Sequence, residues 1–210
     1  MTTVTSFSEW CDAHHLQLNV SKTKEVTFDF RKKSEPHQPL IINGKEIEQV
    51  DEYKYLGTTI AHTLDWTNNT TALRKKSNQR IYFLRMLNNV HVDRTILHLF
   101  YQALIQSVLT YNLICYFGNG TQLNRDHMDR VRRVAQRIIG QDLPSLSNLF
   151  EQRVLSKMEK IMKDQSHPLN KNYTFNRSGI RLRVPRTNRA RFRQSFVANS
   201  IHMFNLNAKR

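Results

Sequence analysis

The sequence predicts an α+β protein with a small antiparallel sheet near the N-terminus, a mainly helical bundle after it, and a basic C-terminal tail. Three observations favour this order. Alternating apolar residues and an Asn-Gly pair are concentrated in the first 66 residues. From there to about residue 170, apolar residues recur at helical spacing. The segment 171–210 carries ten lysines and arginines and no aspartate or glutamate.

The first predicted elements are a short helix and a strand. Phe7–Leu16 has the apolar spacing of a helix, and Ser8 is placed to cap it, because a serine oxygen accepts hydrogen bonds from free N–H groups of a first turn. Glu25–Phe30 predicts a strand, since its apolar side chains alternate with polar ones. The polar segment Arg31–Gln38 predicts a loop.

A hairpin is predicted next. Leu40–Ile42 and Glu46–Val50 flank Asn43-Gly44, and both residues of such a pair accept the positive φ that a two-residue turn requires. Tyr53–Ile60 predicts a further apolar strand, broken by Gly57. These strands make up the expected N-terminal sheet.

The segment 68–117 predicts two helices. The first has apolar residues at helical spacing and is expected to break at Asn88-Asn89. Asp93 is then placed to cap a second helix that runs from Arg94 to about Cys115. The residues expected on one apolar face of this second helix are Ile96, Leu97, Phe100, Leu104, Val108 and Tyr111.

The last third of the sequence predicts two more helices and the tail. Asp126–Ile139 reads as a basic amphipathic helix that stops at Gly140, and Leu149–Met162 reads as another helix. The tail is loop-like at first and becomes helical from about Arg189. The alternative, which the sequence leaves open, is a solvated and poorly ordered tail.

The net charge of +15 is the first functional clue. A strongly basic chain attracts polyanions, of which nucleic acid is the commonest, because each phosphate that it neutralises releases counterions. An anionic membrane surface is the rival partner. No apolar run is long enough to span a membrane and the N-terminus has no secretory pattern, so we expect no membrane association. With only two cysteines, the sequence favours a reducing intracellular compartment, nuclear or cytoplasmic.

Catalytic motifs are sparse. A two-metal enzyme needs carboxylates that hold the ions about 4 Å apart, yet the sequence has no Asp-Asp pair, and Asp51-Glu52 reads as surface charge. Neither a glycine-rich phosphate loop nor a Gly-x-Ser-x-Gly elbow occurs. Cys11 lies near two histidines, but further zinc ligands are not evident. His91-Val92-Asp93 has the form of part of an iron site, although Asp93 is also placed to cap a helix. We therefore expect no metal and no cofactor in this chain.

Several ordered motifs resemble the non-LTR, LINE-type retrotransposon reverse transcriptases, in the part that follows the catalytic palm motif. They are Phe7-x-x-Trp10-Cys11, Leu18-Asn19-x-x-Lys22-Thr23, Tyr53-Lys54-Tyr55-Leu56-Gly57 and Leu64-Asp65-Trp66. Later motifs resemble the thumb and the C-terminal extension of the jockey, CR1 and L2 groups, for example Phe100-Tyr101-Gln102-Ala103-Leu104 and Arg183-Val184-Pro185-Arg186-Thr187.

This resemblance implies four segments: a palm remnant with a primer-grip hairpin (1–66), a thumb-like helical domain (67–117), a helical extension (118–170) and the basic tail (171–210). It also implies contact with an RNA template or an RNA–DNA duplex. The catalytic Tyr-x-Asp-Asp motif of the family has no counterpart here, so we expect no polymerase activity; the complete polymerase would need Mg²⁺. The residues expected to contact nucleic acid are Lys22, Lys24, Tyr55, Leu56, Gly57, Arg74, Lys75, Lys76, Arg80, Arg85, Arg181, Arg183, Arg186 and Arg189.

A second resemblance covers the helical segment from about Thr67 to Leu109. It is similar to a small domain associated with the N-terminus of AlkB-type tRNA-modifying proteins, which join an iron/2-oxoglutarate dioxygenase to a methyltransferase. The dioxygenase requires a jelly roll with two histidines and a carboxylate, and the methyltransferase requires a doubly wound sheet. The sequence predicts neither, so this resemblance implies a helical domain without the catalytic site.

Overall fold

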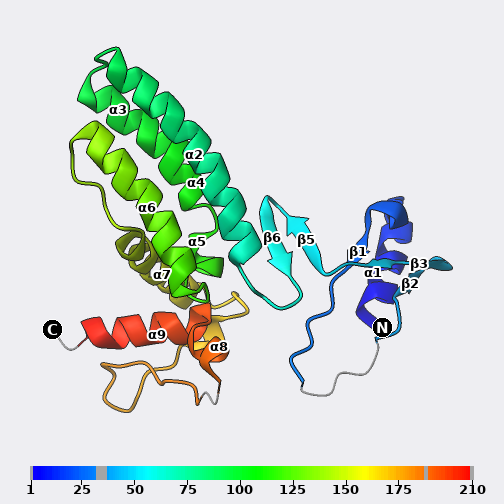
Figure 1. Ribbon diagram of the computed structural model, residues 1–210. Coiled ribbons are helices and arrows are strands. Elements are labelled where there is room, and N and C mark those ends of the chain that lie inside the picture. The colour runs from blue at the N-terminus through cyan, green and yellow to red at the C-terminus, as the bar shows by residue number, and fades with distance from the viewer. Residues whose placement is uncertain (1, 32–36, 187–188, 209–210) are drawn as a thin grey trace. The chain divides into compact units, whose positions relative to one another are not determined.

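The computed structural model describes residues 2–31, 37–186 and 189–208. The chain divides into two compact units, an N-terminal unit (Met1–Asp65) and a C-terminal unit (Trp66–Arg210). The first holds short strand pairs, of which two are antiparallel and one is parallel, together with a helix, and the second is mainly helical (Figure 1). The predicted α+β class is therefore confirmed. The finer division into four segments stays a prediction.

The N-terminal unit begins with helix α1 (Thr2–Ala13), which packs on strand β2 (Ile41–Ile42). The helix starts before the predicted Phe7, so the proposed cap at Ser8 is wrong. Ser8 lies inside the helix, and its hydroxyl donates to Asn43 Oδ1 at 3.3 Å. The buried apolar side chains of this unit are few: Cys11, Ile42 and Ile47.

The predicted Asn-Gly hairpin is confirmed. Strand β2 pairs antiparallel with β3 (Lys45–Glu46), and the turn residues Asn43 and Gly44 have φ of +50° and +73°. Both are in the left-handed region that a type I′ turn requires. The two-residue turn fixes the register of the two strands.

The strand predicted over 25–30 is wrong beyond its first residue. Only β1 (Lys24–Glu25) is paired, and it runs parallel to β4 (Glu48–Gln49). Phe28 and Phe30 are exposed and belong to no strand. An alternating pattern forms a strand only where a neighbour supplies the hydrogen bonds, and no strand of the described residues lies beside these two.

The segment predicted as one strand over 53–60 is instead a second hairpin. Strands β5 (Glu52–Tyr55) and β6 (Thr58–Ala61) pair antiparallel. Leu56 and Gly57 form the turn between them, with φ of +46° and +82°. The sequence predicted only an interruption of one strand at Gly57. In the structure the chain reverses direction there, because glycine accepts positive φ without steric cost. The 3-10 turn η1 (Val20–Lys22) completes the unit.

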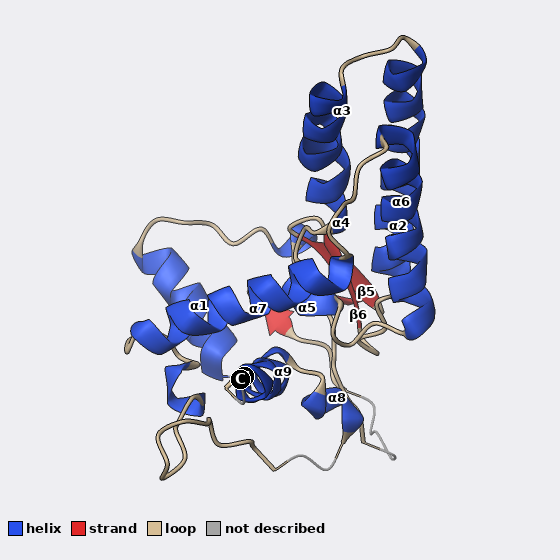
Figure 2. Ribbon diagram, turned by 90° about the vertical axis from the view of Figure 1, so that its left-hand side faces the viewer, coloured by secondary structure: helices blue, strands red, loops and turns tan. Residues whose placement is uncertain are grey.

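The C-terminal unit begins with three packed helical rods. The first is α2 (Thr67–Asn89). The second is continuous through α3 (Arg94–Phe100), the π-helical segment η2 (Tyr101–Gln106) and α4 (Ser107–Leu109). The third is α6 (Gln122–Ile139), and the three lie side by side in Figures 1 and 2. The predicted cap at Asp93 is confirmed, since its carboxylate accepts from Thr95 N at 2.8 Å.

The second rod differs from the prediction in its length and in its buried face. It ends at Leu109, and the short helix α5 (Leu113–Tyr116) follows a left-handed Asn112. In η2 the Ser107 N–H donates to Gln102 O, five residues back. This wider turn moves the buried series to every fourth residue, and Ile96, Leu104 and Tyr111 of the predicted face are exposed. Leu97 and Val108 of the predicted face are buried as expected, and Tyr101, Ile105 and Leu109 are buried beside them.

Helices α6 and α7 (Leu146–Lys163) both start earlier than predicted. Thr121 caps α6 by accepting from Asn124 N at 3.2 Å, and Ser145 caps α7 by accepting from Asn148 N at 3.1 Å. The predicted stop at Gly140 is confirmed, because this residue ends α6 with φ of +72°.

The described part of the tail is folded onto α7, so the open alternative of a loose tail does not hold there. The 3-10 turn η3 (Asn170–Asn172) leads into a short two-stranded bridge, and α8 (Ala190–Arg193) and α9 (Phe196–Asn207) follow. Helix α9 packs against α7, as Figures 1 and 2 show. The buried residues of this layer are Met158, Ile161, Tyr173, Leu182 and Ile201.

Candidate nucleic-acid interface

The N-terminal ends of α2 and α6 lie together in the C-terminal unit. Asn124 near the start of α6 donates from Nδ2 to Thr67 Oγ1 at the start of α2, at 3.2 Å. The two helices therefore run parallel, and residues about 57 apart in sequence face each other along them. Buried side chains close the seam between the rods: Ile81 and Leu84 of α2, and Met128, Val131, Ala135 and Ile139 of α6.

An open groove of about 750 Å³ runs along the outer side of this seam. We call it the α2/α6 groove. Its rim carries the cations Arg74, Lys75 and Arg130, and between them lie hydroxyl, amide and imidazole groups. No carboxylate is among its lining residues, which are Thr71, Arg74, Lys75, Asn78, Gln79, His127, Arg130, Val131 and Val134.

The local sequence explains why no acid faces the groove. Helix α2 contains no aspartate or glutamate over its 23 residues. Helix α6 has two, and Asp129 is held by Arg132, with Nε to Oδ1 at 2.6 Å, and by Arg133 at 3.4 Å. The hydrogen bond from Arg132 lowers the pKa of Asp129, so that carboxylate stays charged and paired. Asp126 is exposed and accepts from Gln122 at 2.8 Å.

The three rim cations consequently keep their donors available. Within the described residues, Arg74, Lys75 and Arg130 form no ion pair. Arginine presents a planar fork that binds two phosphate oxygens at once, and lysine presents a compact charge. The arrangement is chemically suited to bind phosphodiester oxygens.

The sequence-predicted residues of α2 do not all lie at this groove. Arg74 and Lys75 line it. Arg85 is exposed eleven residues after Arg74, which is about three helical turns, and so lies on the same side of α2. Lys76 is exposed elsewhere on the helix. Arg80 donates from Nη1 to Leu104 O in η2, and thus fastens α2 to the second rod.

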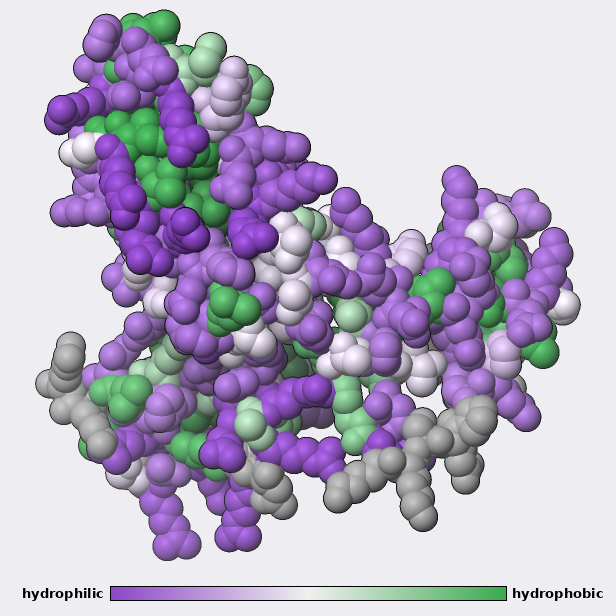
Figure 3. Space-filling view, in the orientation of Figure 1, coloured by the Kyte–Doolittle hydropathy of each residue, from purple (hydrophilic) through white to green (hydrophobic). Residues whose placement is uncertain are grey.

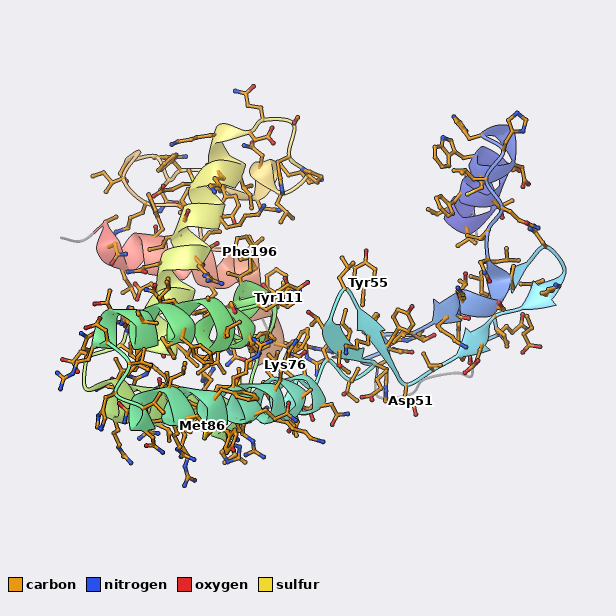
Figure 4. All side chains as sticks on the ribbon, turned by 90° about the horizontal axis from the view of Figure 1, so that it is seen from above. Asp51, Tyr55, Lys76, Met86, Tyr111 and Phe196 are labelled. Atoms are coloured by element: carbon orange, nitrogen blue, oxygen red, sulfur yellow. The ribbon has the colours of Figure 1, made fainter. Side chains whose placement is uncertain are left out.

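The predicted residues of the N-terminal unit are exposed or paired. Lys22 ends the 3-10 turn and is exposed, while the ammonium of Lys24 pairs with Glu48. Tyr55 and Leu56 are 59% and 70% exposed beside the hairpin turn that includes Gly57. Figure 4 shows Tyr55 near that turn and Asp51 at the other end of the hairpin.

The four predicted arginines of the tail are all exposed. Arg181 and Arg183 flank the fully buried Leu182 in the bridge to Phe175, so both point away from the core. Arg186 follows in an irregular segment, and Arg189 precedes α8. All four lie in the segment that leads to α8 and α9.

His127 and Arg130 were missed as site residues. The sequence did mark 126–139 as a basic amphipathic helix, which is the signal that could have found them. It could not show that this helix packs against α2 and not elsewhere. Figure 3 shows a hydrophobic patch among hydrophilic side chains in the region of α3 and α6. In α3, Ile96 and Leu99 are more than half exposed.

The described residues hold no cluster of three or more histidine, cysteine, aspartate or glutamate side chains that could bind a metal ion. Asp93 of the His-x-Asp triplet is used as a helix cap. Cys11 is buried, and the neighbouring His14 stacks on Trp10 with ring centroids 4.3 Å apart. Among the same described residues, no helix is both long enough and apolar enough to cross a membrane.

One protein-family model matches the chain, over residues 66–107, and its description is alkylated DNA repair protein alkB homolog 8, N-terminal. The matched segment comprises α2, α3 and η2, and therefore carries the Arg74 and Lys75 side of the groove. It coincides closely with the segment over which the sequence resembles the AlkB-associated domain. Comparison with curated proteins and with solved structures gives no match. The comparisons thus support the AlkB-type resemblance over this segment and give no support to the reverse-transcriptase resemblance.

Proposed function

We propose that the C-terminal unit is a nucleic-acid-binding module that grips the phosphodiester backbone through the α2/α6 groove, without catalysing a reaction itself. The observation that carries the proposal is the convergence of Arg74, Lys75 and Arg130 from two helices on one groove with no carboxylate in its lining. Such a surface binds polyanions through counterion release and does not depend on their sequence.

The family match is in keeping with this role. The matching family is described as an alkylated DNA repair protein, and its name points to nucleic acid as the partner. We propose that this chain uses the matched helices in the same broad way, as a helical recognition domain of AlkB type. The oxygenase and methyltransferase chemistry associated with such proteins is not assigned to any residue here, since the match covers a helical segment and not a catalytic fold.

The second candidate is a template-primer-binding piece of a reverse transcriptase, and one observation favours it. The resemblance places a primer-grip hairpin at Tyr55-Leu56-Gly57, and those residues do form the tip of a two-stranded hairpin with two exposed apolar side chains. This candidate also predicts nucleic-acid binding, but it adds the N-terminal unit to the interface. A Tyr55→Ala, Leu56→Ala double variant distinguishes the two candidates. It should weaken binding to a primer–template duplex if the chain is a piece of a reverse transcriptase, and should leave binding unchanged if only the α2/α6 groove binds nucleic acid.

The test of the main proposal is the salt dependence of binding by the full chain. Each phosphate contact contributes a slope of about 0.7 to 0.9 in log affinity against log salt, so three contacts predict a slope of about −2 to −3. Replacing Arg74, Lys75 and Arg130 together by alanine should remove most of that slope. Lys163→Ala is the matched control, because Lys163 is exposed in the last turn of α7, outside the groove. A triple variant with the affinity and slope of the unmodified chain would refute the proposal.

A further inference from the structure

The α2/α6 groove is small for a nucleic-acid site. Its volume of about 750 Å³ is in the range of pockets that enclose one small ligand. A double helix is much wider and keeps its bases stacked inside, so only its outer phosphates could reach the rim. The groove floor would then remain uncovered.

The floor itself is apolar. Val131 is buried and Val134 is half-buried, and both line the groove together with the cations of α2 and Arg130 of α6. An unpaired nucleotide matches both features of the groove. The flat apolar face of its base can contact the valines, and its phosphate can bind the cations of the rim. Its base edge would meet polar groups as well, since Asn78, Gln79 and His127 supply donors and acceptors along the same walls.

An exposed aromatic side chain lies further along α2, beyond the residues that line the groove. Tyr82 lies one helical turn beyond Asn78, on the same side of the helix, and its side chain is 57% exposed. Its ring contacts Phe83 edge-on, with centroids 5.5 Å apart and planes at 75°. Because more than half of its surface is exposed, Tyr82 is accessible to an unpaired base, and aromatic rings stack bases of any sequence.

We propose that the α2/α6 groove selects single-stranded nucleic acid: one or two unpaired nucleotides occupy it, their phosphates bind Arg74, Lys75 and Arg130, and the next base stacks on Tyr82. This inference rests on the proposed function, because it names the class of nucleic acid that the same groove binds. It assigns Tyr82, Val131 and Val134 a role in specificity, while the cations supply affinity for any polyanion.

The first experiment compares two probes on the full chain. A fluorescently labelled RNA of about 12 nucleotides and mixed sequence is titrated alone and after annealing to its complement, at the same salt concentration. We expect the single strand to bind at least about tenfold more tightly. Equal binding, or tighter binding of the duplex, would overturn the single-strand inference and leave the proposed function standing. Failure of both probes to bind would overturn both.

The second experiment separates stacking from charge. Tyr82→Ala should weaken single-strand binding by about fivefold or more, because stacking of one base on an aromatic ring has at least that effect, and should leave duplex binding unchanged. Tyr82→Phe should retain the affinity of the unmodified chain. Tyr111→Ala is the control, since Tyr111 is comparably exposed at 47% but follows α4 and belongs to neither of the two helices that form the groove. A Tyr82→Ala variant that binds the single strand normally, or loses both probes equally, would refute the role of Tyr82.

Discussion

The side-chain amide of Asn205 is hydrogen-bonded to both backbone groups of Leu182. Its Oδ1 accepts from Leu182 N at 2.8 Å, and its Nδ2 donates to Leu182 O at 2.9 Å. Leu182 is fully buried, so these two bonds satisfy backbone groups that water cannot reach. The pair joins the segment that carries Arg181 and Arg183 to helix α9.

Asn205→Ala should lower the free energy of unfolding of the C-terminal unit by about 2 kcal/mol, because it leaves a buried N–H and a buried C=O unpaired. The measurement is the urea midpoint of the full chain. Asn207→Ala, at the exposed end of α9, is the control and should change stability by less than about 0.5 kcal/mol. If the two variants were equally stable, the amide would not be holding the strand.

Replacing tyrosine by phenylalanine should affect stability differently at the two buried positions Tyr101 and Tyr116. Tyr116 donates from its hydroxyl to Leu109 O at 2.6 Å, so Tyr116→Phe should cost about 1 kcal/mol of stability. The Tyr101 hydroxyl is buried without a partner among the described residues, so Tyr101→Phe should be neutral or slightly stabilising at neutral pH. Urea unfolding of both variants checks this. A larger loss for Tyr101→Phe than for Tyr116→Phe would contradict it.

Tyr101 should also make the fold sensitive to alkali. Burial raises the pKa of Tyr101 from 10.0 to about 12 in the folded chain. Above pH 10 the unfolded chain therefore loses its tyrosine proton first, and the stability present below pH 10 declines as the pH rises towards 12. Tyr101→Phe should lose less stability than the unmodified chain over this range. Parallel pH dependences of the two proteins would show that the group does not titrate in this way.

The loss of stability in acid should depend in part on Asp129. The hydrogen bond from Arg132 lowers the folded-state pKa of Asp129 below its ordinary value of 3.8, so the unfolded chain binds a proton more readily. The resulting stability is present above about pH 4 and is lost as the pH falls through the folded-state pKa. Asp129→Asn should therefore cost about 1 kcal/mol at pH 7, and less as the pH falls below 4. Unfolding measured at a series of pH values tests this, and a difference that grows in acid would count against it.

Arg80 and Arg74 should behave differently although both were predicted to contact nucleic acid. Arg80→Ala removes the bond to Leu104 O and should lower stability by about 1 to 2 kcal/mol, with little change in nucleic-acid affinity. Arg74→Ala should weaken binding and hardly affect the urea midpoint, because its side chain lines the open groove. Both properties are measured on each variant. The assignment fails if Arg80→Ala loses binding at unchanged stability.

Part of the site could be predicted from the sequence. Arg74 and Lys75 lie in a helical segment without acids, and that much follows from composition and periodicity. Arg130 and His127 could not be placed with them, because a single helix pattern shows which face is apolar but not which helix covers that face. The same limit explains Arg80, whose basic side chain suggested a phosphate contact and instead binds a carbonyl of η2.

The features that the sequence determined by itself depend on interactions between residues close together in the chain. The turn at Asn43-Gly44, the cap at Asp93 and the stop at Gly140 each depend on interactions within a few residues, and all three are present. Tertiary structure decided the rest: the wide turn of η2 that shifted the buried face, the partnership of α2 with α6, and the folding of the tail onto α7. The last two features join segments far apart in the chain, and their energy comes from burying surfaces that only the assembled unit brings together.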